Sequence, residues 1–405
     1  MTSLFDPARH EALAGPRWDA ALARSALQRI AAEAIAAFEP GRGWPAHARD
    51  DPEAPGQRFD MLYMGSGGVI WALQHLARSG VIETPPPALL DEAQALPERN
   101  RALTTGWGYG TASYFMGDAG LMLLQHRLAP SAALADALYA VVEGNFGHPA
   151  REPLWGSPGT LIAALHMAER TGEARWRMLL QRGLEHLWQQ MQFDESAGGV
   201  WLWRQDLYGK QRCFLGAAHG FVGNLYPALR GAALLDPALV ARFLERGLAT
   251  LEATALRDEA GRINWHGFAD PALAAKALPL VQDCHGAPGV ICRLAGAPRT
   301  PAWDALLLAA GELIWHAGPL AKGAGLCHGS AGNGWALLKL ARRSGEERWL
   351  DRARAFAMHA IGQVEQQREK SGHGWYSLWT GDLGVALFLA ACLSGDDACP
   401  TLDVF

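Results

Sequence analysis

Short apolar segments recur along the whole chain, and each follows the same four-residue motif, Gly-x-x-Gly. Examples are Val69 to Leu73, Thr160 to Leu165, Gly334 to Leu338 and Val385 to Leu389. Because these segments have no polar face, they predict helices that are buried on all sides. Several are soon followed by Ser-Gly or Thr-Gly, which is typical of a helix that ends at a glycine.

The Gly-x-x-Gly motif organises the chain into seven repeats. Its copies begin at Gly65, Gly117, Gly156, Gly220, Gly286, Gly329 and Gly381. The spacing of roughly 40 to 65 residues is that of a helical hairpin repeat. Longer stretches between the copies, such as Trp176 to Gln190, Ala238 to Leu251 and Trp349 to Val364, carry apolar residues on one face only. They predict outer helices that cover the buried ones.

These repeats predict an all-α fold, an α/α toroid or barrel of seven helical hairpins. No repeat has the polar outer face of a terminal cap, so a closed ring is favoured over an open solenoid. We expect residues 1–405 to form a single domain, with residues 1–60 as an N-terminal helical segment that closes on the barrel and contains a helix near Arg17 to Phe38. Glycine permits the positive φ or the close backbone approach that each turn needs. The inner helices would then all begin at one end, where function is expected.

Composition narrows the class of protein. The 405 residues are 49% hydrophobic, which supports a large core, and the net charge of -5 without a basic face argues against nucleic acid as a partner. No apolar run has the length of a membrane span and no signal peptide is evident, so we expect a cytoplasmic protein that does not bind membranes. Few lysines and many alanines suggest a GC-rich, bacterial source. The six cysteines do not form a disulfide framework.

Three of the seven motifs carry histidine or cysteine beside the first glycine. They are Ala218-His219-Gly, Asp283-Cys284-His285-Gly and Leu326-Cys327-His328-Gly. Two cysteines and one histidine at one end of a barrel would bind zinc and leave its fourth position open, as in catalytic zinc sites. We therefore predict Cys284, Cys327 and His328 as zinc ligands. The alternative is that the cysteines pack as small apolar residues and His328 caps a helix.

The residues of these motifs resemble those of the corresponding motifs in the lanthionine synthetase C-like family. The matching segments are Ala-Ala-His219-Gly-x-x-Gly, Cys284-His-Gly-Ala-Pro-Gly and Gly-Leu-Cys327-His328-Gly-Ser-Ala-Gly-Asn333, and the resemblance covers nearly the full chain. It implies that the two cysteines and His328 bind zinc. It also implies that zinc lowers the pKa of a bound thiol, which then attacks a dehydroalanine or dehydrobutyrine residue as a thiolate.

The resemblance also implies the residues that move protons. Addition of a thiolate leaves an enolate that must be protonated, and His219 would be the acid–base group. Glu152, four residues before the third motif, would orient His219 or assist proton transfer. His285 is a further candidate, although some cyclases of the family carry tyrosine there. As isolated residues, His219 would be a histidine bonded to backbone and Glu152 an exposed carboxylate.

Two positions indicate which branch of the family the chain resembles. Cyclases similar to the nisin enzyme have arginine four residues before the first zinc cysteine, and here that residue is Leu280. Lys322, five residues before Cys327, resembles the lysine of glutathione-binding LanC-like proteins and would hold a glutathione carboxylate. The alternative for Lys322 is a solvated loop cation.

The leading hypothesis is an enzyme that adds glutathione, or another small thiol, to dehydroamino acids in peptides or proteins. Three alternatives stay open. The thiol could be a cysteine of a precursor peptide, which would make the protein a lanthionine-forming cyclase. Zinc and glutathione could be bound without turnover, as in a sensor. Finally, α/α barrels also support zinc-free sugar-processing enzymes, because a fold does not determine a function.

Overall fold

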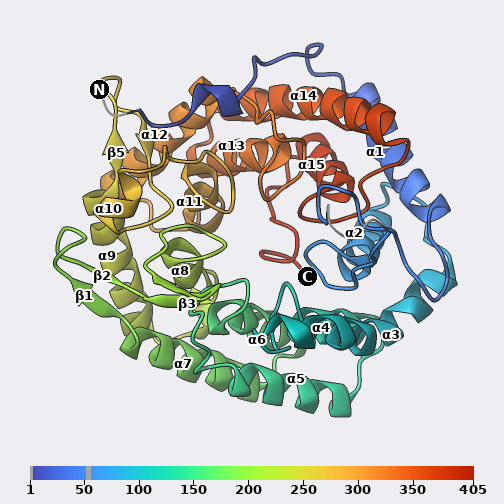
Figure 1. Ribbon diagram of the computed structural model, residues 1–405, viewed down its shortest axis with the longest axis horizontal. Helices are drawn as coiled ribbons and strands as arrows, with labels where there is room; N and C mark the ends of the chain where they lie inside the picture. The colour runs from blue at the N-terminus through green and yellow to red at the C-terminus, as the bar shows by residue number, and fades with distance from the viewer. Residues whose placement is uncertain (1–2, 52–55) are drawn as a thin grey trace. The chain divides into compact units, whose positions relative to one another are not determined.

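The chain is described by a computed structural model that covers residues 3–51 and 56–405. Within these residues it forms fifteen α-helices, three short 3-10 helices and six strands of two or three residues (Figure 1). The strands pair only as three antiparallel hairpins, β1–β2, β3–β4 and β5–β6. The prediction of an all-α fold is therefore confirmed, and the small hairpins are additions that it did not include.

The helices and strands are grouped into two compact units. Of the described residues, the first contains 3–10, 139–318 and 339–346, and the second contains 11–51, 56–138, 319–338 and 347–405. The first holds the elements α6 (Ser157–Thr171), α7 (Ala174–Gln189), β1 (Gln192–Asp194), β2 (Val200–Leu202), β3 (Gln205–Leu207), β4 (Lys210–Arg212), α8 (Phe221–Arg230), α9 (Pro237–Thr254), β5 (Leu256–Arg257), β6 (Ile263–Asn264), α10 (Pro271–Ala274), α11 (Ala287–Leu294) and α12 (Pro301–Ala317). The second holds α1 (Ala20–Ala36), α2 (Ser66–Arg78), α3 (Pro87–Thr104), α4 (Asp118–Leu128), α14 (Glu347–Ser371) and α15 (Asp382–Ser394). Two helices, α5 (Ala132–Gly144) and α13 (Ser330–Ser344), have residues in both.

Every Gly-x-x-Gly motif leads into a helix, as predicted. The seven helices are α2, α4, α6, α8, α11, α13 and α15. In α6 all residues from Ser157 to Ala168 are buried, whereas α7 buries a single stripe that includes Trp176, Leu180 and Leu187. Within the units α6 packs on α7, α8 on α9, α11 on α12 and α2 on α3. Inner and outer helices therefore alternate along the chain in the predicted way.

The glycines are needed because backbone approaches them closely. A Cβ on Gly332 would lie 1.8 Å from the carbonyl oxygen of Leu326, and one on Gly289 would lie 1.9 Å from that of Asp283. In both motifs the loop turns back over the first turn of the helix, so that the carbonyl six residues earlier occupies the place of the side chain. Only glycine leaves room for this contact.

Replacing Gly332 by alanine is therefore expected to lower the free energy of unfolding by about 3 kcal/mol. The carbonyl of Leu326 is part of the backbone, so it cannot shift as easily as the end of a flexible side chain. Gly362 offers a matched control, since it lies exposed in α14 and a Cβ at this position would meet nothing within 4 Å. Gly362→Ala should raise stability slightly. Urea denaturation of both variants measures the difference, and equal stabilities would contradict the steric argument.

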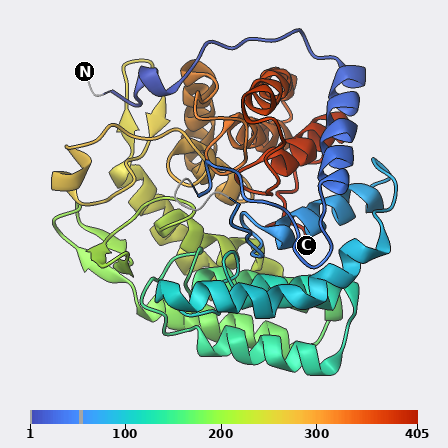
Figure 2. The same ribbon diagram turned by 45° about the vertical axis from the view of Figure 1, so that its right-hand side comes forward.

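The N-terminal helix packs against the C-terminal part of the chain. Within the second unit α1 contacts both α14 and α15 (Figure 2), and it buries an apolar stripe that includes Ala23, Leu27 and Ile30. That residues 1–60 close on the barrel stays a prediction. The extent of the single domain stays a prediction. In the described part of the chain no helix is long and apolar enough to cross a membrane.

Candidate functional site

Glu152 and His219 form a hydrogen-bonded pair. Glu152 lies in the loop before α6 and has no exposed surface. Its carboxylate accepts the backbone N–H groups of Leu154 at 3.0 Å and Trp155 at 2.6 Å, and it lies 2.9 Å from Nδ1 of His219. The two backbone bonds fix the carboxylate in the turn. The structure therefore brings together two residues that are 67 positions apart in sequence.

This pairing sets the protonation of the imidazole. Because a carboxylate accepts hydrogen bonds, His219 donates from Nδ1, and Nε2 is the second ring nitrogen, which can accept or release a proton. Burial alone would lower the pKa of His219, but the hydrogen bond and charge of Glu152, with the charge of Cys284, raise it above its ordinary value. His219 is thus prepared to hold and deliver a proton.

His285 stacks on His219 but has the opposite electrostatic character. Their ring centroids are 5.8 Å apart with an interplanar angle of 28°. Burial lowers the pKa of His285 below its ordinary value, and the neighbouring His219 lowers it further. Phe214 lies beside both rings, at centroid distances of 6.2 Å and 6.1 Å. His285 therefore favours the neutral form beside a histidine that favours the charged one.

Backbone hydrogen bonds tie the His219 loop to Cys284. The N–H groups of Ala217 and Ala218 both donate to the Cys284 carbonyl, at 3.0 Å and 3.2 Å. Gly216 makes this possible, because a Cβ there would lie 2.3 Å from that same oxygen. The Cys284 thiol is buried, and Nε2 of Gln282 lies 2.9 Å from its sulfur. The predicted acid–base histidine and the first predicted ligand thus occupy adjoining loops.

Cys327 and His328 precede α13, in the sixth motif. Cys327 is buried, and its N–H donates to the carbonyl of Trp379 at 2.8 Å. His328 is half-buried. Cys284 belongs to the first unit, Cys327 and His328 belong to the second, and all six cysteines are free thiols. Two thiols and one imidazole are donors that suit zinc, so these residues could hold it and leave a fourth position open.

Lys322 lies on the loop that leads to Cys327. Its side chain is exposed, and its carbonyl accepts a hydrogen bond from the Arg49 guanidinium at 2.5 Å. Asp50, the next residue along, accepts the indole N–H of Trp375 at 2.5 Å. Burial raises the pKa of Asp50, and the hydrogen bonds from Trp375 and Thr380 and the charges of His328 and Lys322 oppose that shift. Asp50 is therefore the carboxylate that faces both predicted site residues.

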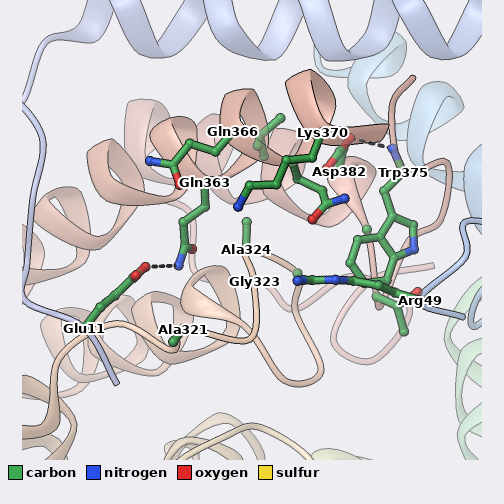
Figure 3. A pocket seen from close by; sticks show the side chains of 15 residues that line it. Glu11, Arg49, Ala321, Gly323, Ala324, Gln363, Gln366, Lys370, Trp375 and Asp382 are labelled. Atoms are coloured by element: carbon green, nitrogen blue, oxygen red, sulfur yellow. Dashed lines mark hydrogen bonds between the residues drawn. The ribbon is translucent and has the colours of Figure 1, made fainter. Parts of the chain in front are cut away.

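A polar cavity of about 120 Å³ adjoins this loop (Figure 3). Its walls carry cations, carboxylates and amides, and Figure 3 shows the side chains of Arg49 and Lys370 directed into it from two elements. The lining residues include Glu11, Arg49, Gly323, Gln363, Lys370, Trp375 and Asp382. The sequence analysis missed Arg49, Lys370 and Asp382. No motif surrounds Arg49 and Lys370, Asp382 occupies a variable position of the seventh Gly-x-x-Gly motif, and only the tertiary fold places the three beside Gly323.

The raised pKa of Asp382, which lines this cavity, can be tested through the pH dependence of stability. Its carboxylate accepts the backbone N–H of Trp375 at 2.7 Å, and burial raises the pKa of this carboxyl group to about 7. Between its ordinary value near 3.8 and about 7, the unfolded chain releases this proton while the folded chain keeps it, so stability falls as pH rises. Asp382→Asn should remove this loss and gain up to about 4 kcal/mol over the wild type from pH 4 to pH 7. Denaturation of both proteins across that range measures the gain, and a constant difference would contradict it.

Sequence comparison relates the chain to a known protein family and to individual proteins. Residues 51–404 match the family described as lanthionine synthetase C-like protein. The chain is 28% identical over 355 residues to the glutathione S-transferase LANCL1 of Danio rerio, covering 82% of each protein. It is 38% identical over 113 residues to the LanC-like protein GCL1 of Arabidopsis thaliana, which is 26% of each.

Among solved structures, nisin cyclase has the same fold. The TM-score is 0.64 at 15% sequence identity, and the alignment covers 92% of this chain and 94% of that one. This likeness confirms the predicted fold class, an α/α toroid. The match over residues 51–404 establishes that the chain belongs to the lanthionine synthetase C-like family.

Proposed function

We propose that the protein adds a small thiol, glutathione or a similar one, to dehydroalanine or dehydrobutyrine residues in peptides or proteins. The observation that carries this proposal is the hydrogen bonding of the His219 loop to the Cys284 backbone. It supports a site in which a histidine backed by a buried carboxylate adjoins the loop of a predicted zinc ligand. A thiolate and a proton donor are the two groups that such an addition requires.

The reaction forms a C–S bond between the thiolate and the β-carbon of the dehydroamino acid. The π electrons of the double bond move toward the α-carbon and its carbonyl, and the α-carbon then takes a proton. His219 delivers this proton from Nε2 while Glu152 stabilises the charged imidazole through Nδ1. Zinc bound by Cys284, Cys327 and His328 would lower the pKa of the incoming thiol, whose proton leaves to solvent. The net change is addition of S–H across C=C.

The polar cavity beside Lys322 supports a zwitterionic peptide as the thiol substrate. Arg49 and Lys370 are suited to bind carboxylates, and Glu11 or Asp382 is suited to bind an α-ammonium group. Glutathione carries two carboxylates and one ammonium group. Lys322 would add a further cation at the entrance. The name of the Danio rerio relative, a glutathione S-transferase, agrees with this choice.

The experiment combines metal analysis with a product assay. Purified protein should contain about one zinc per chain, and incubation with glutathione and a dehydroalanine peptide should yield the mass of the adduct. A peptide that carries both cysteine and dehydroalanine tests the cyclase alternative in the same assay. Zinc without any adduct would reject the proposed catalysis in favour of a binding role, and absence of zinc would reject the metal site.

A further inference from the structure

The hairpin β3–β4 has an unfavourable residue in its turn. Leu207 pairs with Lys210, so only Tyr208 and Gly209 connect the strands. Both have positive φ, 54° for Tyr208 and 68° for Gly209, as the type I′ turn of a two-residue hairpin requires. Glycine adopts this conformation freely, and asparagine is the side chain that best tolerates the first position. Tyrosine there is strained, and such strain is retained mainly at functional sites.

Hydrogen bonds attach this hairpin to the segment around Glu152. The N–H of Asp206 donates to the carbonyl of Pro149 at 3.0 Å, and the amide of Gln205 donates to that of Arg151 at 3.2 Å. Arg151 returns a bond from its guanidinium to the carbonyl of Arg204 at 2.9 Å. The base of the hairpin is therefore fixed beside the carboxylate that holds His219.

Tyr208 reaches from this hairpin to the acid–base pair. Its ring meets the His219 ring edge to face, with centroids 6.1 Å apart and an angle of 72°. Its hydroxyl oxygen accepts the indole N–H of Trp155 at 3.2 Å, and the backbone N–H of Trp155 binds Glu152. The residue is nevertheless 53% exposed. A tyrosine that is fixed at both ring and hydroxyl, yet open to solvent, is placed to meet a substrate.

We infer that Tyr208 contacts the acceptor peptide and determines its position over His219. The inference rests on the function proposed above. The Tyr208 ring forms a wall against which the planar dehydroamino acid lies. Its hydroxyl, oriented by Trp155, donates a hydrogen bond to the carbonyl oxygen that gains negative charge as the C–S bond forms. No proton or electron is transferred through Tyr208, because the α-carbon is protonated from His219.

Tyr208→Asn separates this role from a structural one. It creates Asn-Gly, the preferred type I′ pair, so the melting temperature should rise, while kcat/KM for a dehydroalanine peptide falls at least about tenfold. Glutathione affinity, measured by calorimetry, should stay unchanged. Tyr208→Phe keeps the strained turn and the ring, so it should leave the melting temperature unchanged and lower kcat/KM through loss of the hydroxyl alone. Lys210→Gln, at an exposed site of the same hairpin, should alter neither property.

The outcomes also separate this inference from the proposed function. A lower melting temperature with unchanged kcat/KM in Tyr208→Asn would show a purely structural tyrosine and overturn the inference alone. Weakened glutathione binding would place Tyr208 on the thiol side and overturn it as well. If the wild type forms no adduct, the proposed function fails first and the inference fails with it.

Discussion

Replacing Cys327 by alanine is expected to remove the bound zinc and to reduce thiol addition by at least about a hundredfold. The three predicted ligands would hold the metal and leave one position open, so loss of one thiolate would leave too few donors. Without the metal, only a few per cent of glutathione is thiolate near pH 7, and the sulfur is no longer positioned. Metal content by mass spectrometry and the rate of adduct formation give the two readouts. Cys284→Ala should behave in the same way.

A third buried thiol supplies the control. Cys392 lies in α15 with no exposed surface, and burial raises the pKa of its thiol well above the ordinary value, as in a cysteine that only packs. Cys392→Ala should lower stability modestly and keep both zinc and activity. Full zinc content in Cys327→Ala would contradict the ligand set, whereas zinc loss in all three variants would indicate general unfolding.

Replacing His219 by asparagine is expected to lower the rate of addition by a factor of about 10² to 10⁴ without loss of zinc. The α-carbon then takes its proton from water, while the thiolate is still formed and positioned. Glu152→Gln should have a smaller effect. Its single amide oxygen can accept only one of the backbone N–H groups of Leu154 and Trp155, which bind different carboxylate oxygens of Glu152, and it no longer carries the charge that raises the pKa of His219. Single-turnover rates with saturating glutathione isolate this step.

Retained zinc and an unchanged melting temperature would show that the effect on rate is chemical. Trapping in deuterated water adds an independent readout, because the stereochemistry of the added hydrogen should become random when water replaces His219 as the donor. Activity equal to the wild type in His219→Asn would remove this residue from the mechanism and leave His285 as the candidate.

The repeated motif explains why the fold could be predicted. Seven copies of Gly-x-x-Gly before apolar segments indicated the seven inner helices, because a buried helix and a close backbone approach both impose local composition. The β-hairpins were missed because each strand has only two or three residues, too few to show an alternating pattern. The strained turn at Tyr208 left no sign in the sequence, since a single Tyr-Gly pair is compatible with many conformations.

The candidate site likewise contains some residues that the sequence predicts and others that only the structure reveals. Cys284, Cys327, His328 and His219 stood in motifs, so chemistry and spacing pointed to them. Glu152 was suggested by resemblance alone, and its bond to His219 required the structure. Arg49 and Lys370 come from segments without any repeat, and their approach to Gly323 is a product of tertiary packing. Residues of this kind cannot be found from spacing along the chain.

The packing of α1 on α15 has a consequence for synthesis. The apolar stripe of α1 leaves the ribosome before α15, which is made about 350 residues later, a delay of roughly 20 to 70 s at ordinary rates of chain growth. During that time the stripe has no native partner from the end of the chain. The stripe is therefore exposed to non-native apolar contacts until the last repeat emerges.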